Sequence, residues 1–162
     1  MWEDKGFLQD DLADVTSAMQ QLKSLILTVK ERYEKMDAGE LLVAPAPGKW
    51  SKQQVLGHLI DSAINNVKRF TEAQFLEQPC PIIPYQQNKL MEVNHYQDLP
   101  IGHLLTLWQS LNQQILFIVE KMPAEKRLFP VKPQYNQTGT QTLAWLICDY
   151  VAHMQHHLKS IT

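Results

Sequence analysis

The sequence predicts an all-α protein built as a four-helix bundle. Four long segments repeat apolar residues at intervals of three and four, which is the spacing of one face of an α-helix. No segment shows a convincing apolar–polar alternation of the kind that marks a half-buried strand. Two long connections that contain prolines separate the later segments, so the topology need not be simple up-down-up-down.

The first helix is expected from about Phe7 to Met36. Apolar residues recur along it at intervals of seven, four and three, with Gln, Lys and Glu between them. These apolar positions are Phe7, Val15, Leu22, Ile26, Val29, Tyr33 and Met36. Gly39 is expected to stop this helix, and the prolines at 45 and 47 to stiffen a turn that ends at Gly48.

The second helix is expected to begin just after Trp50. Ser51, followed three residues later by Gln54, has the pattern of a capping box, and Trp50 is placed to act as a hydrophobic staple against Val55. His58 lies beside the apolar stripe of this helix. That stripe consists of Val55, Leu59, Ala63, Val67 and Phe70.

A proline-rich loop, Pro79–Tyr85, follows the second helix, and Gln86–Tyr96 is expected to form a short helix or turn. The third long helix has Pro100 near its first turn, where a missing N–H costs least, and ends at Pro123. Its stripe consists of Leu104, Trp108, Leu111, Ile115, Ile118 and Met122.

The segment Leu128–Gly139 is expected to be irregular or extended, and Thr140 to cap the fourth helix. Along that helix apolar residues and one histidine repeat at alternating intervals of four and three, as in a bundle seam. The repeat consists of Leu143, Ile147, Tyr150, Met154, His157 and Ile161. His157 therefore occupies a position that the pattern assigns to the core, with His153 beside it.

The composition and charge of the chain exclude several classes of function. The 162 residues, of which 44% are hydrophobic and 20% charged, fit one globular domain spanning 1–162. The net charge is -2 and the basic residues are dispersed, which argues against nucleic-acid binding. The sequence shows no secretion signal and no apolar stretch long enough to span a membrane. We therefore expect a soluble, cytoplasmic protein.

Three histidines suggest a metal site. His153 and His157 are four residues apart, so they lie one above the other on a helix face. With His58 from a facing helix they could hold one divalent metal ion and leave a coordination position open for water or substrate. Neutral imidazoles suit zinc or nickel, and the absence of an acidic cluster disfavours magnesium or calcium.

The histidines could also have purely structural roles. A single histidine on an apolar face is usually a core residue satisfied by one hydrogen bond, and an H-x-x-x-H spacing often arises by chance. Asp61, Ser62 and Asp149 lie one turn from the histidines and either orient a ligand ring or face water. The remaining histidines, His95, His103 and His156, are expected to face solvent.

Two sequence stretches resemble motifs of the DinB-like superfamily, which includes YfiT-type metal-dependent hydrolases. Gly48–Ser62, which reads GKWSKQQVLGHLIDS, is similar to the motif that contains the family's first histidine. Leu143–His157, which reads LAWLICDYVAHMQHH, is similar to its closing H-x-x-x-H motif. The resemblance extends over nearly the whole chain.

The resemblance implies a four-helix bundle with long crossover loops and a divalent metal, commonly zinc or nickel, held by His58, His153 and His157. It also implies frequent homodimers. Family members with known activity include S-transferases that use low-molecular-weight thiols such as bacillithiol, and mycothiol-dependent isomerases. Many have no known activity, so fold and metal carry over better than substrate does.

Two hypotheses of different classes follow. The first is a metal-dependent thiol S-transferase or hydrolase acting on a small molecule, with the Pro79–Tyr96 loop walling the pocket through Tyr85 or Asn94. The second is a non-catalytic metal- or small-ligand-binding protein of a stress response. A homodimer is also expected, through helix faces away from the metal end. Leu8, Leu12 and Leu25 lie outside the main stripe of the first helix, although a broad apolar stripe in a monomeric bundle could also bury them.

Overall fold

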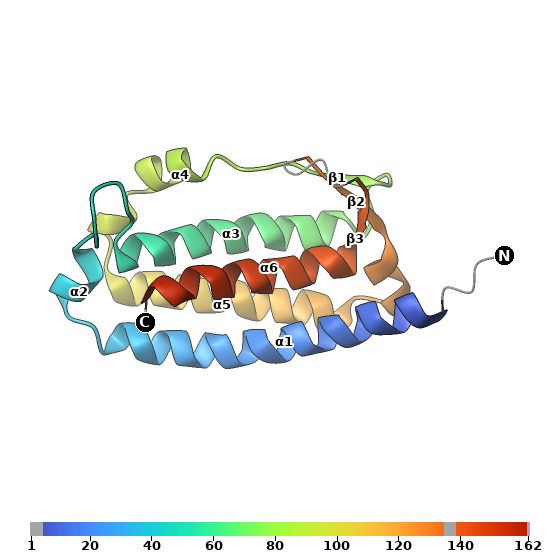
Figure 1. The fold of residues 1–162 in the computed structure, drawn as a ribbon, viewed down its shortest axis with the longest axis horizontal. Coiled ribbons are helices and arrows are strands. Elements are labelled where there is room, and N and C mark those ends of the chain that lie inside the picture. The colour runs from blue at the N-terminus through green and yellow to red at the C-terminus, as the bar shows by residue number, and fades with distance from the viewer. Residues whose placement is uncertain (1–4, 135–138, 162) are drawn as a thin grey trace.

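The computed structural model describes residues 5–134 and 139–161, with residues 5–13 described by backbone alone. Four long helices form the bundle, and each corresponds to a helix expected from the sequence. They are α1 (Lys5–Glu34), α3 (Lys52–Glu72), α5 (Ile101–Lys121) and α6 (Leu143–Leu158). Figure 1 shows them extending along the long axis of the molecule. The predicted fold class, an all-α four-helix bundle, is confirmed.

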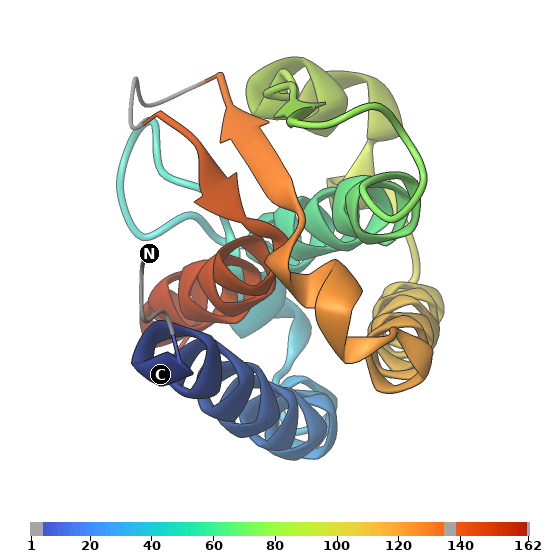
Figure 2. The same ribbon diagram turned by 90° about the vertical axis from the view of Figure 1, so that its right-hand side faces the viewer.

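The order of the helices around the bundle follows from their contacts. α1 packs on α5 and α6, and α3 packs on the same two helices, so α1 and α3 lie on one diagonal (Figure 2). In Figure 1, α1 and α6 run in one direction, whereas α3 and α5 run in the other. Because neighbouring α3 and α5 are parallel, the chain between them must return along the whole bundle. The topology is therefore not up-down-up-down, as the long connections had indicated.

Both long connections contain short strands, which the sequence patterns did not predict. The strands are β1 (Cys80–Ile82), β2 (Pro130–Pro133) and β3 (Gln141–Thr142). β2 is central, parallel to β1 and antiparallel to β3, so that Val131 lies opposite Cys80 on one side and Gln141 on the other. Strands of two to four residues are too short to show an alternating pattern, so the sequence gives no signal for them.

Short helices complete the connections. They are α2 (Ala38–Leu42), α4 (Gln87–Asn94), and the 3₁₀ turns η1 (Tyr96–Asp98), η2 (Ala124–Leu128) and η3 (Lys159–Ile161). α4 confirms the short helix expected between Gln86 and Tyr96. Figure 1 shows α4 lying above α3, on the outside of the bundle.

The helix ends agree only in part with their predicted caps. The capping box of α3 is confirmed, because the Gln54 N–H donates to Ser51 Oγ at 3.1 Å and the Ser51 N–H donates to Gln54 Oε1 at 2.9 Å. Thr142, not Thr140, caps α6, and its Oγ1 accepts from the Trp145 N–H at 3.0 Å. Thr140 was wrong because β3 extends the chain by two residues before the helix starts.

Gly39 was also assigned wrongly. α1 ends at Glu34, and Gly39 lies inside the short helix α2. Asp37 begins α2 with its own capping box, in which Oδ1 accepts from the Glu40 N–H at 2.9 Å. The acceptor side chain at Asp37 therefore offsets the low helix propensity of the glycine.

The core lies between the four long helices. Its largest fully buried side chains are Trp108, Tyr33, Phe70, Leu22, Leu56, Leu59 and Ile60. Leu25 is half-buried and packs against this core, whereas the side chains of Leu8 and Leu12 lie outside the described residues. Among the described helices, none is both long and apolar enough to cross a membrane.

Candidate metal centre and adjoining pocket

His58 is the most deeply buried of the three candidate ligands. It lies on the face of α3 that packs against α6, and only 1% of its surface is exposed. Neither of its ring nitrogens has a hydrogen-bond partner. A buried imidazole without any partner is costly, because its polar atoms lose water and gain nothing in return. An imidazole whose two buried nitrogens lack partners fits the chemistry of a metal ligand.

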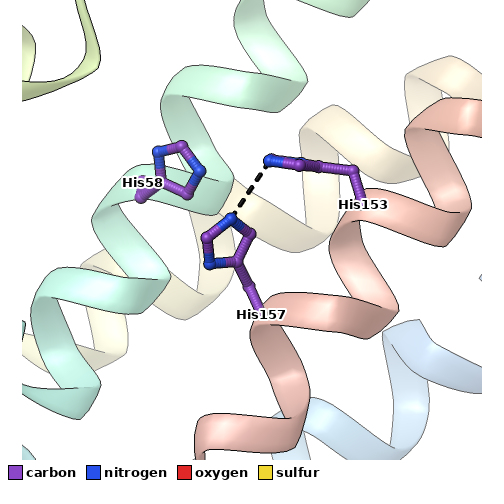
Figure 3. A group of neighbouring side chains, drawn as sticks. All are labelled: His58, His153 and His157. Atoms are coloured by element: carbon purple, nitrogen blue, oxygen red, sulfur yellow. Dashed lines mark hydrogen bonds between the residues drawn. The ribbon is translucent and has the colours of Figure 1, made fainter.

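His153 and His157 approach His58 from α6. Figure 3 shows the two rings one turn apart on α6, with His58 opposite them on α3. The Nε2 atoms of His153 and His157 are 3.0 Å apart. The ring centroid of His58 lies 5.3 Å from that of His153 and 4.5 Å from that of His157. The three rings together place one nitrogen each within 4.8 Å of the others.

The environment keeps these imidazoles neutral. Burial lowers the pKa of His58 to about 3, with further lowering by the neighbouring His157 and His153. Burial also lowers the pKa of His157, to about 4, and that of His153. A neutral imidazole has a free lone pair on one ring nitrogen, which is the form of histidine that coordinates a metal ion.

The three histidines fit a divalent transition metal. Zn–N bonds of about 2.0–2.1 Å in a tetrahedral site separate ligand nitrogens by about 3.3 Å. The 3.0 Å separation of the His153 and His157 Nε2 atoms, and the 4.8 Å limit for all three rings, are of the size that ligands of one ion require. His58 and the His153–His157 pair, expected from sequence to meet, are thus brought together.

Trp50 covers one side of this cluster. Its ring centroid is 4.9 Å from that of His58 and 6.4 Å from that of His157. The sequence placed Trp50 as a staple against Val55, but its described ring contacts are with the histidines. The half-buried indole is therefore an aromatic wall of the candidate metal centre as well as part of the start of α3.

Asp61 forms a separate polar network next to the centre. The Tyr96 hydroxyl donates to Asp61 Oδ1 at 2.5 Å, and the Asn94 amide donates to the same oxygen at 3.1 Å. Asp61 Oδ2 is buried without a partner. Burial raises the pKa of this carboxyl group, while the two hydrogen bonds act in the opposite direction. Asn94 thus belongs to this network and not to the lining of the main pocket.

A pocket of about 250 Å³ opens beside His153. Ser62 and Asp149, two of the residues proposed to orient a ligand, lie on its wall, as does the proposed pocket residue Tyr85. The complete lining is Ser62, Asn66, Arg69, Pro84, Tyr85, Gln87, Leu146, Asp149, Tyr150 and His153. Burial raises the pKa of Asp149, and the nearby Arg69 lowers it.

Sequence reasoning missed Arg69 and Asn66. Both lie on α3, with Asn66 eight and Arg69 eleven residues after His58, so a helical wheel centred on His58 would have placed them on the same stripe. The other histidines behave as expected, because His95, His103 and His156 are exposed.

A helical bundle with three histidines grouped between two of its helices defines a class of candidate metalloproteins. The chain belongs to the DinB superfamily, whose family model matches residues 13–161. The resemblance noted in the sequence is therefore confirmed.

Relatives and solved structures agree with this assignment. A protein of Bacillus cereus that carries the provisional name of a metal-dependent hydrolase is 28% identical over 147 residues, covering 89% of this chain and 81% of its own. A Bacillus mycoides protein of the same provisional name is 27% identical over 160 residues, covering 97% and 87%.

Two solved structures share the fold. YfiT from Bacillus subtilis, described as a probable metal-dependent hydrolase with an unusual four-helix bundle topology, has a TM-score of 0.80 at 24% identity, covering 91% of this chain and 83% of that one. A mycothiol-dependent maleylpyruvate isomerase has a TM-score of 0.60 at 15% identity, covering 91% of this chain and 59% of the isomerase. At these identities the likeness establishes the fold alone.

Proposed function

We propose that this protein is a metal-dependent enzyme acting on a small molecule, with His58, His153 and His157 as ligands of one zinc or nickel ion. One observation carries the proposal: a buried His58 without a hydrogen-bond partner faces His153 and His157, and His153 lines a pocket of about 250 Å³. A purely structural histidine cluster needs neither the orphaned nitrogens nor the pocket.

The relatives support a metal-dependent reaction. The Bacillus proteins and YfiT bear names that connect them with metal-dependent hydrolysis, and the isomerase depends on mycothiol, a thiol. When bound, a zinc or nickel ion supplies Lewis-acid chemistry that lowers the pKa of a coordinated thiol or water molecule. Three protein ligands leave room for that molecule.

Residues around the metal ligands would bind the substrate and transfer a proton. The neutral histidines hold the ion without adding charge, and Trp50 covers one side of the cluster, which limits access by water. Tyr85 and Leu146 offer apolar surface for the rest of a substrate. Asp149 offers a carboxylate on the same wall, where it can accept or return a proton.

We place transfer of a low-molecular-weight thiol first and hydrolysis second. In the transfer, the thiol sulfur bonds to an electrophilic carbon as the bond to the leaving group breaks, and the thiol proton leaves to solvent or to Asp149. Asp149 lines the pocket and could also serve as a general base for hydrolysis, so the preference for thiol transfer comes from the affinity of zinc and nickel for sulfur ligands.

The test compares metal-loaded, metal-free and His157→Ala protein in one panel of thiols, electrophiles and hydrolysable esters and amides. We expect turnover only with the metal-loaded wild type, in the thiol arm. Metal-dependent ester or amide cleavage without thiol consumption would assign hydrolysis. Metal binding without turnover in any arm would favour the non-catalytic binding protein.

A further inference from the structure

Three buried polar atoms without hydrogen-bond partners lie within one turn of α3. They are Nδ1 and Nε2 of His58 and Oδ2 of Asp61, and both residues are almost fully buried. In the part of the chain that the structure describes, the other such atoms belong to Trp108 on α5 and Arg127 on η2. Unpartnered buried polar atoms are rare and costly, so three of them in one helical turn need a common explanation.

The two nitrogens of His58 face different surroundings. Figure 3 shows one nitrogen of the ring directed toward the His153–His157 pair and the other directed away from it. A neutral imidazole that binds a metal ion through one nitrogen carries its proton on the other. If the first nitrogen binds the ion, the second is a buried N–H donor that needs an acceptor.

Asp61 is placed to be that acceptor. It follows His58 by three residues, so the two Cβ atoms are about 5–6 Å apart, and its side chain leans back over Gly57 and His58. On the Gly57 side the carboxylate is already engaged, because Tyr96 and Asn94 both donate to Oδ1. Oδ2 is the oxygen that remains.

We propose that Asp61 is a positioning residue of the metal centre, whose Oδ2 accepts the ring N–H of His58 and so holds the other nitrogen of that ring toward the ion. This inference rests on the proposed function, since it assumes that the three histidines bind a metal. Tyr96 and Asn94 hold the carboxylate by its other oxygen, so the crossover between α3 and α5 supports the site.

The structure itself does not contain this hydrogen bond, since both groups lack partners. Metal coordination favours its formation, because a cation on one ring nitrogen makes the N–H on the other a stronger donor to a carboxylate. The terminal torsion of a histidine side chain varies broadly at little cost, so rotation of the His58 ring is enough to direct the N–H at Asp61.

The first measurement is zinc affinity, determined by competition with a chelator. Asp61→Asn keeps the shape of the side chain and an oxygen for Tyr96, but it presents an NH₂ group where His58 needs an acceptor. We expect zinc affinity to fall roughly ten- to hundredfold, the usual effect of losing such a partner. Asp98→Asn is the matched control, because it makes the same change at an exposed carboxylate of the same crossover and should keep wild-type affinity.

The second measurement is the NMR signal of the His58 ring N–H in zinc-loaded, ¹⁵N-labelled protein. In the wild type this proton should be shifted downfield and exchange slowly with water, because it is buried and bonded to a carboxylate. Asp61→Asn should lose both properties. Tyr96→Phe removes a donor to Oδ1 but leaves Oδ2, so it should lower stability and still keep the downfield proton.

A purely structural role of Asp61 predicts a different pattern: Asp61→Asn would lower stability but leave the zinc affinity and the His58 proton as in the wild type. That result overturns the proposal. So does a zinc-loaded wild type whose His58 ring proton has an ordinary shift and exchanges rapidly, and this observation needs no variant that must fold. Zinc binding without these signatures refutes only the role of Asp61. Failure of the wild type to bind zinc or nickel refutes the proposed metal site together with this inference.

Discussion

The Tyr96 hydroxyl donates a 2.5 Å hydrogen bond to Asp61, and the ring that carries it lies directly on the backbone of α3 at Gly57. A Cβ atom placed on Gly57 would be 2.3 Å from Cδ2 of that ring. The absence of a side chain at Gly57 is thus what lets Tyr96 reach Asp61, one turn beyond His58. This contact links the crossover from α3 to α5 with the helix that carries the first histidine.

Gly57→Ala should therefore destabilise the protein, although alanine ordinarily favours helices. The added methyl group must displace the Tyr96 ring and break its bond to Asp61, at a cost of about 2–4 kcal/mol. Gly102→Ala is the control, because no atom lies within 4 Å of a Cβ atom there and the change should be neutral or stabilising. Chemical denaturation measures both, and equal stability of the two variants would contradict the Tyr96 argument.

Zinc or nickel should stabilise the folded protein against heat. A metal that binds only the folded state adds RT ln(1 + [L]/Kd), or about 2.7 kcal/mol at a hundredfold excess over Kd. His157→Ala should lose most of this stabilisation and most of the bound metal, whereas His156→Ala, an exposed neighbour, should keep both. Thermal melts with chelator, zinc and nickel, together with elemental analysis, make the comparison. Equal metal content in the two variants would exclude His157 from the site.

The metal-free protein should lose stability as pH falls below about 6.5, the ordinary pKa of histidine. The pKa of His58 in the folded state is lowered to about 3, so between these values the unfolded chain takes up a proton that the folded chain refuses. Stability contributed by neutral His58 is complete above 6.5 and declines toward pH 3, with a limiting slope of about 1.4 kcal/mol per pH unit.

Denaturation of metal-free protein at a series of pH values measures this slope. His58→Gln, which removes one of the three titrating rings, should reduce the slope between pH 6.5 and pH 4, and the lowered pKa values of His153 and His157 account for the slope that remains. The exposed His95→Gln should leave the slope unchanged. Zinc affinity should fall over the same acidic range, because protons compete for the imidazole nitrogens. A profile that is unchanged in His58→Gln would show that another group causes the dependence.

A homodimer remains a prediction from the family resemblance. Leu25 packs against the core, so it no longer argues for an exposed apolar face. Leu27 on α1 and Phe117 on α5 are 65% and 51% exposed and are better positions to test. Light scattering across micromolar concentrations should give twice the 18.7 kDa chain mass, and Leu27→Glu should lower it if α1 forms the interface. A monomer mass throughout would exclude a stable dimer.

The sequence alone predicted the four long helices and the histidines that meet between two of them. Both follow from local periodicity: residues three and four apart share a helix face whatever the rest of the chain does. His157 at a seam position and His58 beside a stripe had to lie near the core once the helices packed. The capping box at Ser51 was predictable for the same reason, since its two hydrogen bonds span only three residues.

Tertiary structure decided what the connections do. The small sheet depends on pairing between Cys80 and Val131, which are distant in sequence and carry no local signal. Asn94 was expected in the pocket but donates to Asp61, because the return of the chain along α3 brings the end of α4 over that residue. Arg69 lies on a predictable helix face, yet only the folded loop supplies the Ile83 carbonyl and the Tyr85 ring that hold it at the pocket wall. Helical periodicity fixes which residues share a face; long-range backbone contacts fix what that face meets.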